Sequence, residues 1–360
     1  MWLLFAFYGG VSMDVLMFNP SVDFGYNPSK NSYVFFSGDK REFNRIKSNK
    51  YVDFIVENAS NKISIKDFLN NGNMLGLEKQ ELKLHLAILC RKGITLIKDV
   101  EQNTEYAVTE LSNNYRYGYQ LLYLKERFKN NLEGMDDDEI QKVISSFSVV
   151  IIGAGSPGSL LAVMFAAIGV GNISIIDGDV VDESNLMRQF FYFERDIGNK
   201  KVTALKNYIK KFNSGVCVNA VSSYINEDNV YNLIPDADMI IQTADKPIGI
   251  IDRLVDKCSE KKKVPCLFMH NQSIGPLVIP GKTKSFRDFE VKYNEETNGM
   301  YFDEIEYQDK RSNPGYPTIV HGVIPLTTKV FDVVLSYMFK DDVSYLEDGI
   351  WFENGNMQRF

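Results

Sequence analysis

Residues 147–159 read FSVVIIGAGSPGS, an apolar run followed at once by a turn that contains three glycines. An apolar run of this length is typical of a parallel strand that is buried on both faces. Gly153, Gly155 and Gly158 form a G-x-G-x-x-G pattern, in which glycine lets the backbone turn tightly and approach a phosphate group. The N-terminus of the following helix favours the phosphate charge. The segment therefore predicts a nucleotide-binding strand, turn and helix.

The sequence after this turn continues to alternate between helix and strand patterns. An apolar helix is predicted at residues 159–169, and the run ISIID at residues 173–177 predicts a second strand. Asp177 closes that strand, where an acid can bond a ribose hydroxyl. We expect this βαβ unit to begin a Rossmann-like, doubly wound α/β sheet within residues 145–360. Further elements are predicted as helices at residues 200–212 and 249–260 and as strands at residues 216–221, 239–242 and 265–269.

The residues that follow the second strand decide which nucleotide is expected. Two runs follow it, DGDVVDESNLMRQ at residues 177–189 and DIGNKK at residues 196–201. An NAD enzyme has no need for Asn185, Arg188 and Lys201 so close to its ribose-binding acid. Cleavage of ATP between the α and β phosphates does need such groups, because it places charge on both products. The two runs therefore predict ATP as the ligand.

The same two runs resemble the D-x-D-x-V-x-x-S-N-L-x-R-Q and D-x-G-x-x-K signatures of the ThiF, MoeB and ubiquitin-activating (E1-like) adenylating enzymes. The resemblance implies that Asp177 holds the ATP ribose. It implies that the phosphates are contacted by Asn185, Arg188 and Lys201. It also implies that ATP is bound by Asp179, by Gln189 and by the three glycines of the turn.

Predictions about metals rest on one acid and on the cysteines. Asp245, in the run QTAD at residues 242–245, stands where the resemblance places an acid that positions Mg²⁺. The family often has a further acid at the position of Gln242, so this chain departs from the pattern there. Many relatives also bind zinc through two C-x-x-C pairs, the first directly after a G-K-T run. Here residues 284–287 read KSFR, and no such pair is formed by Cys90, Cys217, Cys258 and Cys266, so we expect no zinc.

Three further runs resemble the peptide-modifying branch of this family, which includes the enzymes of microcin C7 and pantocin A biosynthesis. They are ADKP at residues 244–247, GPLVIPGKT at residues 275–283 and GIW at residues 349–351. The resemblance covers roughly residues 113–351. It implies adenylation of a carboxylate on a ribosomally made precursor peptide, as one step in making a modified peptide antibiotic. The absence of zinc ligands is shared with the pantocin A enzyme, which activates a glutamate side chain and drives a condensation.

Residues 1–98 carry a different pattern, predicted as a winged-helix-like module. Helical patterns at residues 51–57 and 79–91 are followed by the strand-like run GITLI at residues 93–97. The resemblance implies that this module binds the leader part of the peptide by pairing it with a sheet edge. Residues 99–144 are predicted as a linker and a helix.

Composition excludes several classes of partner. A formal charge of −7 and a pI of about 5.2 argue against nucleic acid, whose binders usually carry a basic stripe. The apolar run at residues 1–15 is shorter than the roughly 18 residues that suggest a membrane span, and we interpret it as a buried pair of strands. Scattered cysteines are typical of a reduced, cytoplasmic protein.

An arginine from a second subunit often completes the active site in enzymes of this family. The candidate here is Arg116 in the run NYRY at residues 114–117, although another alignment puts Gly118 at that place. The resemblance therefore implies a homodimer.

Three other functions compete with peptide adenylation. The first is activation of a sulfur-carrier or ubiquitin-like protein, which usually needs zinc and often a transfer cysteine. Cys266 is the candidate for that cysteine, but its apolar surroundings favour a buried core residue. The second is an NAD-dependent oxidoreductase, which the phosphate-directed side chains disfavour. The third is a non-catalytic binding protein, which the full set of ATP-binding residues disfavours.

Overall fold

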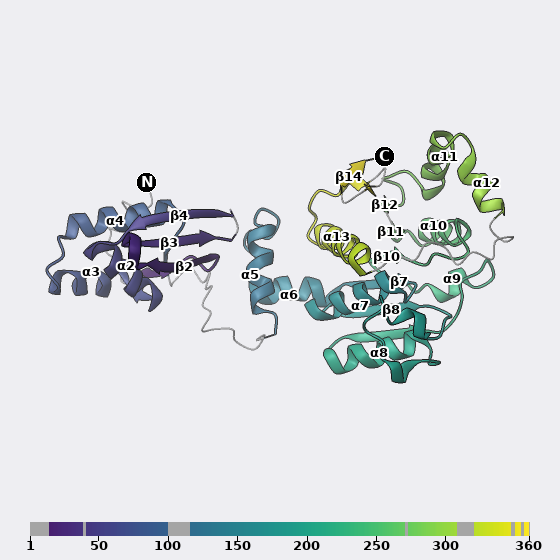
Figure 1. The fold of residues 1–360 in the computed structure, drawn as a ribbon, viewed down its shortest axis with the longest axis horizontal. Coiled ribbons are helices and arrows are strands. Elements are labelled where there is room, and N and C mark those ends of the chain that lie inside the picture. Colours follow the sequence, from purple (N-terminus) through teal and green to yellow (C-terminus); the bar gives the residue numbers. More distant parts are fainter. Residues whose placement is uncertain are drawn as a thin grey trace. The chain divides into compact units, whose positions relative to one another are not determined.

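The computed structural model describes residues 14–38, 41–99, 116–270, 273–307, 320–346, 350–353 and 356–359. Nearly all of the predicted strand pair at residues 1–15 lies outside these ranges. The chain divides into two compact units, Met1–Arg127 and Phe128–Phe360 (Figure 1). Their boundary falls within the stretch predicted as linker and helix. Helix α5 (Gly118–Arg127) lies in that stretch, and α6 (Asp137–Ser146) begins in it and ends two residues beyond it.

The C-terminal unit is built on an eight-stranded sheet with the order β14-β13-β12-β11-β10-β7-β8-β9. Five neighbouring strands are parallel: β7 (Ser148–Ile152), β8 (Asn172–Ile176), β9 (Cys217–Val221), β10 (Met239–Gln242) and β11 (Cys266–Met269). Three antiparallel strands extend the sheet beyond β11: β12 (Ser273–Val278), β13 (Ile350–Glu353) and β14 (Asn356–Arg359). The predicted α/β fold is confirmed, with strand β10 at the predicted residues.

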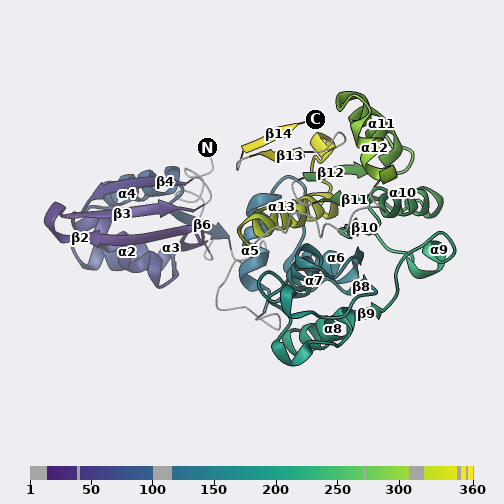
Figure 2. The same cartoon turned by 45° about the vertical axis from the view of Figure 1, so that its right-hand side comes forward.

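Helices cover both faces of this sheet, which explains why its central strands β7, β10 and β11 are buried over nearly their whole length (Figure 2). Along β7, Val150 and Ile152 belong to the core under α10, whereas Val149 and Ile151 point to the opposite face and are equally buried. One group of helices comprises α7 (Ser156–Ile168), α8 (Lys201–Phe212) and α13 (Val320–Met338). The other comprises α9 (Val230–Leu233), α10 (Ile250–Lys262), α11 (Phe286–Glu296) and α12 (Met300–Tyr307).

The strand order reverses between β7 and β10. From β7 the chain adds β8 and β9 on one side, and it then returns to place β10 on the other side of β7. In open α/β sheets, ligands bind beyond the carboxyl ends of the strands at such a reversal. The turn at residues 153–155, which follows β7, and the turn at residues 243–249, which follows β10, both lie there.

In its described residues, the N-terminal unit holds two small sheets and four α-helices, the last of which is α5. One sheet has the order β2-β3-β4 and the other the order β5-β1-β6. Its strands are β1 (Asp14–Phe18), β2 (Val22–Asn27), β3 (Ser32–Ser37), β4 (Glu42–Lys47), β5 (Ile63–Ser64) and β6 (Thr95–Asp99). Its first three helices are α2 (Lys50–Ser60), α3 (Ile65–Met74) and α4 (Lys79–Arg91). The order α2-β5-α3-α4-β6 fits the predicted module, and its assignment as a winged helix stays an interpretation.

No helix in the described part of the chain is long and apolar enough to cross a membrane.

Candidate nucleotide site

The glycine turn after β7 is tightly packed at two of its three glycines. A Cβ at Gly153 would lie 2.9 Å from Thr243 Oγ1 and 3.0 Å from the Ala244 nitrogen, and φ of Gly153 is +96°. A Cβ at Gly158 would lie 1.9 Å from the Gly153 carbonyl oxygen. Other residues at these two positions would therefore collide with backbone.

Gly155 differs, because the protein itself leaves room at this position. A Cβ there would meet only Gln189 Nε2, at the ordinary distance of 3.9 Å. Gly155 is also the N-cap of α7 and makes no side-chain cap, so the N–H groups of Ser156 and Gly158 in the first turn, where Pro157 carries none, meet no capping side chain. Such a helix start, with no side chain over it, suits a phosphate group.

Asp177 is fixed beside the glycine turn by two backbone hydrogen bonds. Its Oδ2 accepts from the Ala154 nitrogen at 2.6 Å, and its Oδ1 accepts from the Asp179 nitrogen at 2.7 Å. Ala154 is held from the other side by Tyr192, whose hydroxyl donates to the Ala154 carbonyl oxygen at 2.7 Å. Burial raises the pKa of Tyr192 well above its ordinary value, so the hydroxyl stays a donor. The predicted ribose acid thus lies against the predicted phosphate turn.

Lys201 and Asp179 form an ion pair across the site. Lys201 is the first residue of α8 and is only 6% exposed, and its Nζ lies 2.9 Å from Asp179 Oδ2. Asp179 Oδ1 accepts a second bond, from the Tyr224 hydroxyl at 2.7 Å. Burial alone would raise the pKa of Asp179, but the bonds from Lys201 and Tyr224 outweigh it and lower the pKa below its ordinary value. The charge of Lys246 contributes to the same lowering, which places the turn after β10 near this pair.

The loop between β8 and α8 holds the remaining polar residues. Asn185 is buried, and its Oδ1 accepts from the Asp182 nitrogen at 3.1 Å, within a short 3₁₀ turn. Arg188 is half-buried, and its Nη1 donates to the Ser184 carbonyl oxygen at 2.9 Å. Gln189 is 4% exposed, and its Oε1 has no hydrogen-bond partner in the described part of the chain. Because Gln189 Nε2 faces Gly155, this amide is placed to meet a ligand at the glycine turn.

The contacts of Gln242 explain why this chain has an amide where the family often has an acid. Gln242 is fully buried at the end of β10, and its Nε2 donates to the Ala244 carbonyl oxygen at 2.8 Å and to Asp252 Oδ1 at 2.9 Å. Its Oε1 accepts from the Ala244 nitrogen at 3.3 Å. The amide thus braces the turn that leads to Asp245. Burial raises the pKa of Asp252, which a hydrogen bond from Gln242 partly offsets.

Asp245 itself is exposed, next to this braced turn. Thr243 Oγ1 donates to the Ile152 carbonyl oxygen at 2.8 Å, so the turn lies directly against the end of β7. In the described part of the chain, no three His, Cys, Asp or Glu side chains converge to hold a metal ion. A carboxylate by itself fits Mg²⁺, which usually takes one or two protein carboxylates and completes its shell with phosphate oxygens and water. The assignment of Asp245 to Mg²⁺ stays a prediction.

Arg116 lies in the other unit of the chain. It is exposed and precedes α5, within Met1–Arg127, whereas the residues described above belong to Phe128–Phe360. Its predicted action across a dimer interface stays a prediction. The cysteines are free, and Cys266 is fully buried, so that burial raises the pKa of its thiol well above the ordinary value. A thiol of this kind makes a poor transfer nucleophile.

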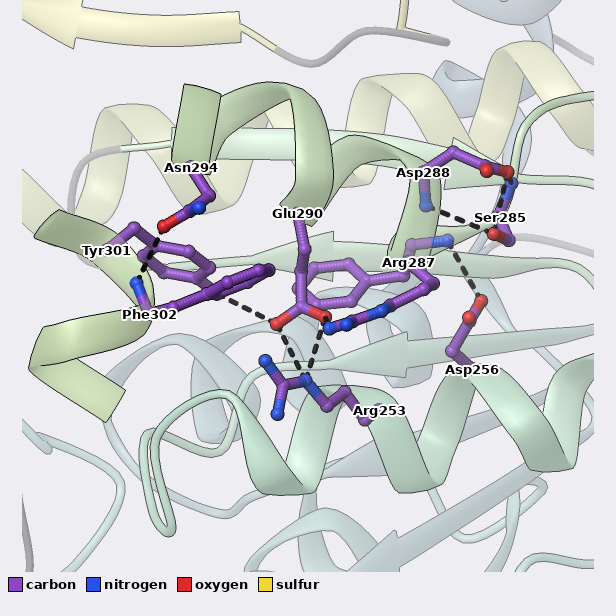
Figure 3. Close-up of polar contacts among 10 residues, drawn as sticks. Arg253, Asp256, Ser285, Arg287, Asp288, Glu290, Asn294, Tyr301 and Phe302 are labelled. Atoms are coloured by element: carbon purple, nitrogen blue, oxygen red, sulfur yellow. Dashed lines mark hydrogen bonds and ion pairs between the residues drawn. The ribbon is translucent and has the colours of Figure 1, made fainter. Parts of the chain in front are cut away.

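A second polar cluster connects α11 and α12, which follow β12, with α10, which follows the turn at residues 243–249. Glu290 of α11 is fully buried, and its Oε2 lies 2.8 Å from Arg253 Nε of α10 and 3.0 Å from Arg287 Nη1 (Figure 3). The Tyr301 hydroxyl of α12 donates to Glu290 Oε1 at 3.2 Å. The ring of Phe302 lies beneath both guanidinium groups, at 5.5 Å from Arg253 and 5.0 Å from Arg287. Figure 3 shows the carboxylate enclosed by these groups.

The Glu290 cluster also reaches the edge of the nucleotide site. Ile305 of α12 lies so close to Gly249 that a Cβ at Gly249 would be 2.5 Å from the Ile305 side chain. Gly249 is the N-cap of α10 and ends the turn that carries Asp245. The position of α12 is therefore coupled to that turn.

Replacing Glu290 with alanine is expected to lower the free energy of unfolding by about 3 kcal/mol, because it leaves two arginines without their buried partner. Urea denaturation followed by circular dichroism measures this. Asp236→Ala is the matched control, since Asp236 forms an ion pair with Lys262 but its side chain is 93% exposed. That variant should unfold like the wild type. Equal midpoints for both variants would show that the Glu290 cluster does not fasten these helices.

Fold and site together define a nucleotide-binding α/β protein whose ligand site combines an open helix start with a buried lysine. The chain matches the model of the ThiF family over residues 128–334, more than half of its length, and it belongs to that family.

Comparisons with individual proteins agree with this family. The chain is 34% identical over 151 residues to the sulfur carrier protein ThiS adenylyltransferase of Bacillus subtilis, covering 40% of this chain and 44% of that protein. It is 29% identical over 177 residues to the adenylyltransferase and sulfurtransferase UBA4 of Scheffersomyces stipitis, covering 47% and 36%. The chain spans between a quarter and about half of the length of such curated relatives.

Among solved structures, the fold is similar to that of E. coli MccB in complex with AMPCPP and MccA. The TM-score is 0.66 at 21% sequence identity, and the match covers 97% of this chain and 96% of that chain. MccB is named as a microcin C7 biosynthetic enzyme and has also been solved with ATP. At this identity the likeness is one of fold.

Proposed function

We propose that this protein is an ATP-dependent adenylyltransferase that activates a carboxylate of a ribosomally made precursor peptide and releases pyrophosphate. One observation carries the adenylation step: the open start of α7, Asp177 and the buried Lys201 meet where the strand order reverses. The first suits a phosphate, the second a ribose and the third the charge of a departing pyrophosphate. Family membership supports the same reaction.

In the proposed reaction, a peptide carboxylate oxygen attacks the α-phosphorus of ATP. The bond from that phosphorus to the bridging oxygen breaks, the new phosphorus–oxygen bond forms the acyl-adenylate, and pyrophosphate leaves with the bonding electrons. Asp177 would hold the ribose, and Asn185, Arg188 and Lys201 would neutralise the phosphates. A magnesium ion held by Asp245 and by phosphate oxygens would add positive charge at the same place.

Lys201 has to change partner for this role. Its Nζ is bound to Asp179 at 2.9 Å, and Asp179 keeps a second donor in Tyr224. A triphosphate offers Nζ several anionic oxygens, and Asp179 would still be hydrogen-bonded after Lys201 turns away. The pair therefore keeps a buried ammonium neutralised until ATP arrives, which avoids an unpaired buried charge.

We assign the leader part of the peptide to the edge of the N-terminal sheet at β4. This edge is unpaired in the described part of the chain, and α4 lies beside it, because Lys92 Nζ donates to Asn44 Oδ1 of β4 at 3.1 Å. Leu84 and Ile88 precede Lys92 by two turns and one turn, respectively, on the same side of α4, and they are 55% and 41% exposed. An extended peptide paired with β4 could bury its apolar side chains against these two residues.

Several finer features of the proposal rest on the resemblance in sequence. The activated group would be a glutamate side chain whose adenylate condenses further, as in pantocin A biosynthesis. The enzyme would be a cytoplasmic homodimer without zinc, in which Arg116 reaches the site of its partner. MccB, which shares the fold, has been solved bound to the peptide MccA, which supports a peptide substrate.

Activation of a sulfur-carrier protein is the second candidate function. It is favoured by the activity that the curated relatives' names state, such as the ThiS adenylyltransferase of Bacillus subtilis. The complete burial of Cys266 argues against a mechanism that uses this residue as a transfer cysteine.

Exchange of radiolabelled pyrophosphate into ATP separates these functions. The purified protein should catalyse exchange only when a peptide with a matching leader and an available carboxylate is present. Exchange driven by a ThiS-like carrier protein instead would favour the second candidate. Absence of exchange with both classes of acceptor, in a protein that still binds ATP, would contradict adenylation of either substrate.

A further inference from the structure

Tyr224 is an exposed aromatic residue at the nucleotide edge of the sheet. It follows β9, is 66% exposed and lies close to the predicted ribose acid, since the Asp177 nitrogen donates to the Val221 carbonyl oxygen at 3.1 Å. The ends of β8 and β9 are in register, with Ile176 opposite Val221. The residues directly after these two strands therefore share one corner of the site.

The ring of Tyr224 occupies the space that a side chain at position 178 would fill. A Cβ on Gly178 would lie 2.6 Å from Cγ and from Cδ2 of Tyr224 and 2.7 Å from Cδ1, so the ring packs flat on the Gly178 backbone. The Tyr224 hydroxyl is bound to Asp179 Oδ1 at 2.7 Å, which fixes the far end of the ring. One face is thus held by the chain, and the high exposure of the residue leaves the other face open.

This arrangement places a flat apolar surface one residue beyond Asp177. If Asp177 bonds the ribose hydroxyls, the base attached to the same sugar has to lie near this strand end, where Gly178 follows Asp177. An aromatic ring that is already held in place can stack with a base at little entropic cost. Stacking on an aromatic side chain contributes to affinity for every base, because each base has a π face.

We infer that Tyr224 is the residue on which the adenine of ATP stacks. The inference rests on the proposed function, since it takes ATP as the ligand and Asp177 as its ribose contact. A competing role is positional: through Asp179, the hydroxyl of Tyr224 could hold Lys201 for the phosphates. The two roles differ in the part of Tyr224 that matters, the ring in one case and the hydroxyl in the other.

Titration with the triphosphate of 2-aminopurine riboside tests the inference, because the fluorescence of this base is quenched on stacking. The full-length wild type and Tyr224→Phe should quench the bound base equally and bind it and ATP with affinities within about twofold of each other. Tyr224→Ala should bind ATP about tenfold or more weakly and leave the bound base bright. Phe212→Ala is the matched control. Phe212 is an exposed aromatic residue (40%) at the C-terminal end of α8, whereas Lys201 lies at the N-terminal end of this helix.

Each contrary result has a separate meaning. Quenching in Tyr224→Ala equal to that in the wild type would overturn the inference and leave the proposed function intact. A loss in Tyr224→Phe as large as in Tyr224→Ala would assign Tyr224 to positioning through Asp179 and would also overturn it. Failure of the folded wild type to bind either nucleotide would overturn the proposed function, and this inference with it.

Discussion

Lys201→Ala is expected to slow ATP–pyrophosphate exchange by about 10² to 10³-fold, the usual loss for a preorganised charge contact. Lys201 Nζ is a nearly buried ammonium that meets the phosphates in a low-dielectric setting, where each unit of charge has a large effect. Negative charge grows on the pyrophosphate as it leaves, so the contact strengthens in the transition state. The loss should therefore appear mainly in kcat, with a smaller change in the KM for ATP.

Arg188→Ala should follow the same pattern, since its side chain extends from the same loop that leads to α8. Lys211→Ala is the matched control, because it removes an exposed lysine from the far end of the same helix. Circular dichroism checks that all variants are folded. Wild-type exchange in both Arg188→Ala and Lys201→Ala would refute the phosphate assignments, and the ligand of the Rossmann-like unit would have to be reconsidered.

Removal of residues 1–98 is expected to raise the KM for the precursor peptide by about 100-fold or more. If the N-terminal unit holds the leader, the carboxylate of the same peptide is kept at a high effective concentration near the C-terminal unit. Loss of the leader contact removes this advantage, and the carboxylate then has to bind from solution. The affinity for ATP should stay nearly unchanged, because the predicted nucleotide residues all belong to Phe128–Phe360. Steady-state kinetics with peptide varied at saturating ATP measure the first quantity, and calorimetry measures the second. An equal loss of both would contradict the division of labour.

A paired variant locates the leader contact without removing the unit. Leu84→Asp combined with Ile88→Asp places two charges beside β4 and should raise the KM for peptide in the same direction. Met74→Asp combined with Leu75→Asp is the matched control, since these residues are also apolar and are 84% and 69% exposed, but end α3. Equal kinetics for the two variants would move the leader away from the edge at β4.

The sequence predicted the fold of the C-terminal unit because its decisive signals are local. A buried apolar run, a glycine turn and an acid at the next strand end all lie within residues 147–177. The loop from Asn185 to Lys201 was predicted as one ligand-binding segment for the same reason, and the structure brings it to the glycine turn through Gln189. Whether each residue contacts ATP stays a prediction.

Contacts between distant parts of the chain were not predicted from the sequence. Tyr192 supports Ala154 from 38 residues away, and Tyr224 reaches Asp179 from 45 residues away. A lone tyrosine in a loop gives no local signal, because periodicity reports only which face of an element is buried. The Glu290 cluster was missed for a similar reason: its members come from three helices, and a glutamate in a helix usually faces solvent.

The brace at Gln242 restricts how this site can evolve. An amide both donates and accepts, so Gln242 can bind the N–H and the C=O of Ala244 and still donate to Asp252. A carboxylate at position 242 would accept only, and it would set two buried like charges against each other. An acid at position 242 therefore requires position 252 to change as well. A single substitution that places an acid at position 242 would therefore lower the stability of the fold, and Asp245 remains the acid that the turn after β10 presents to solvent.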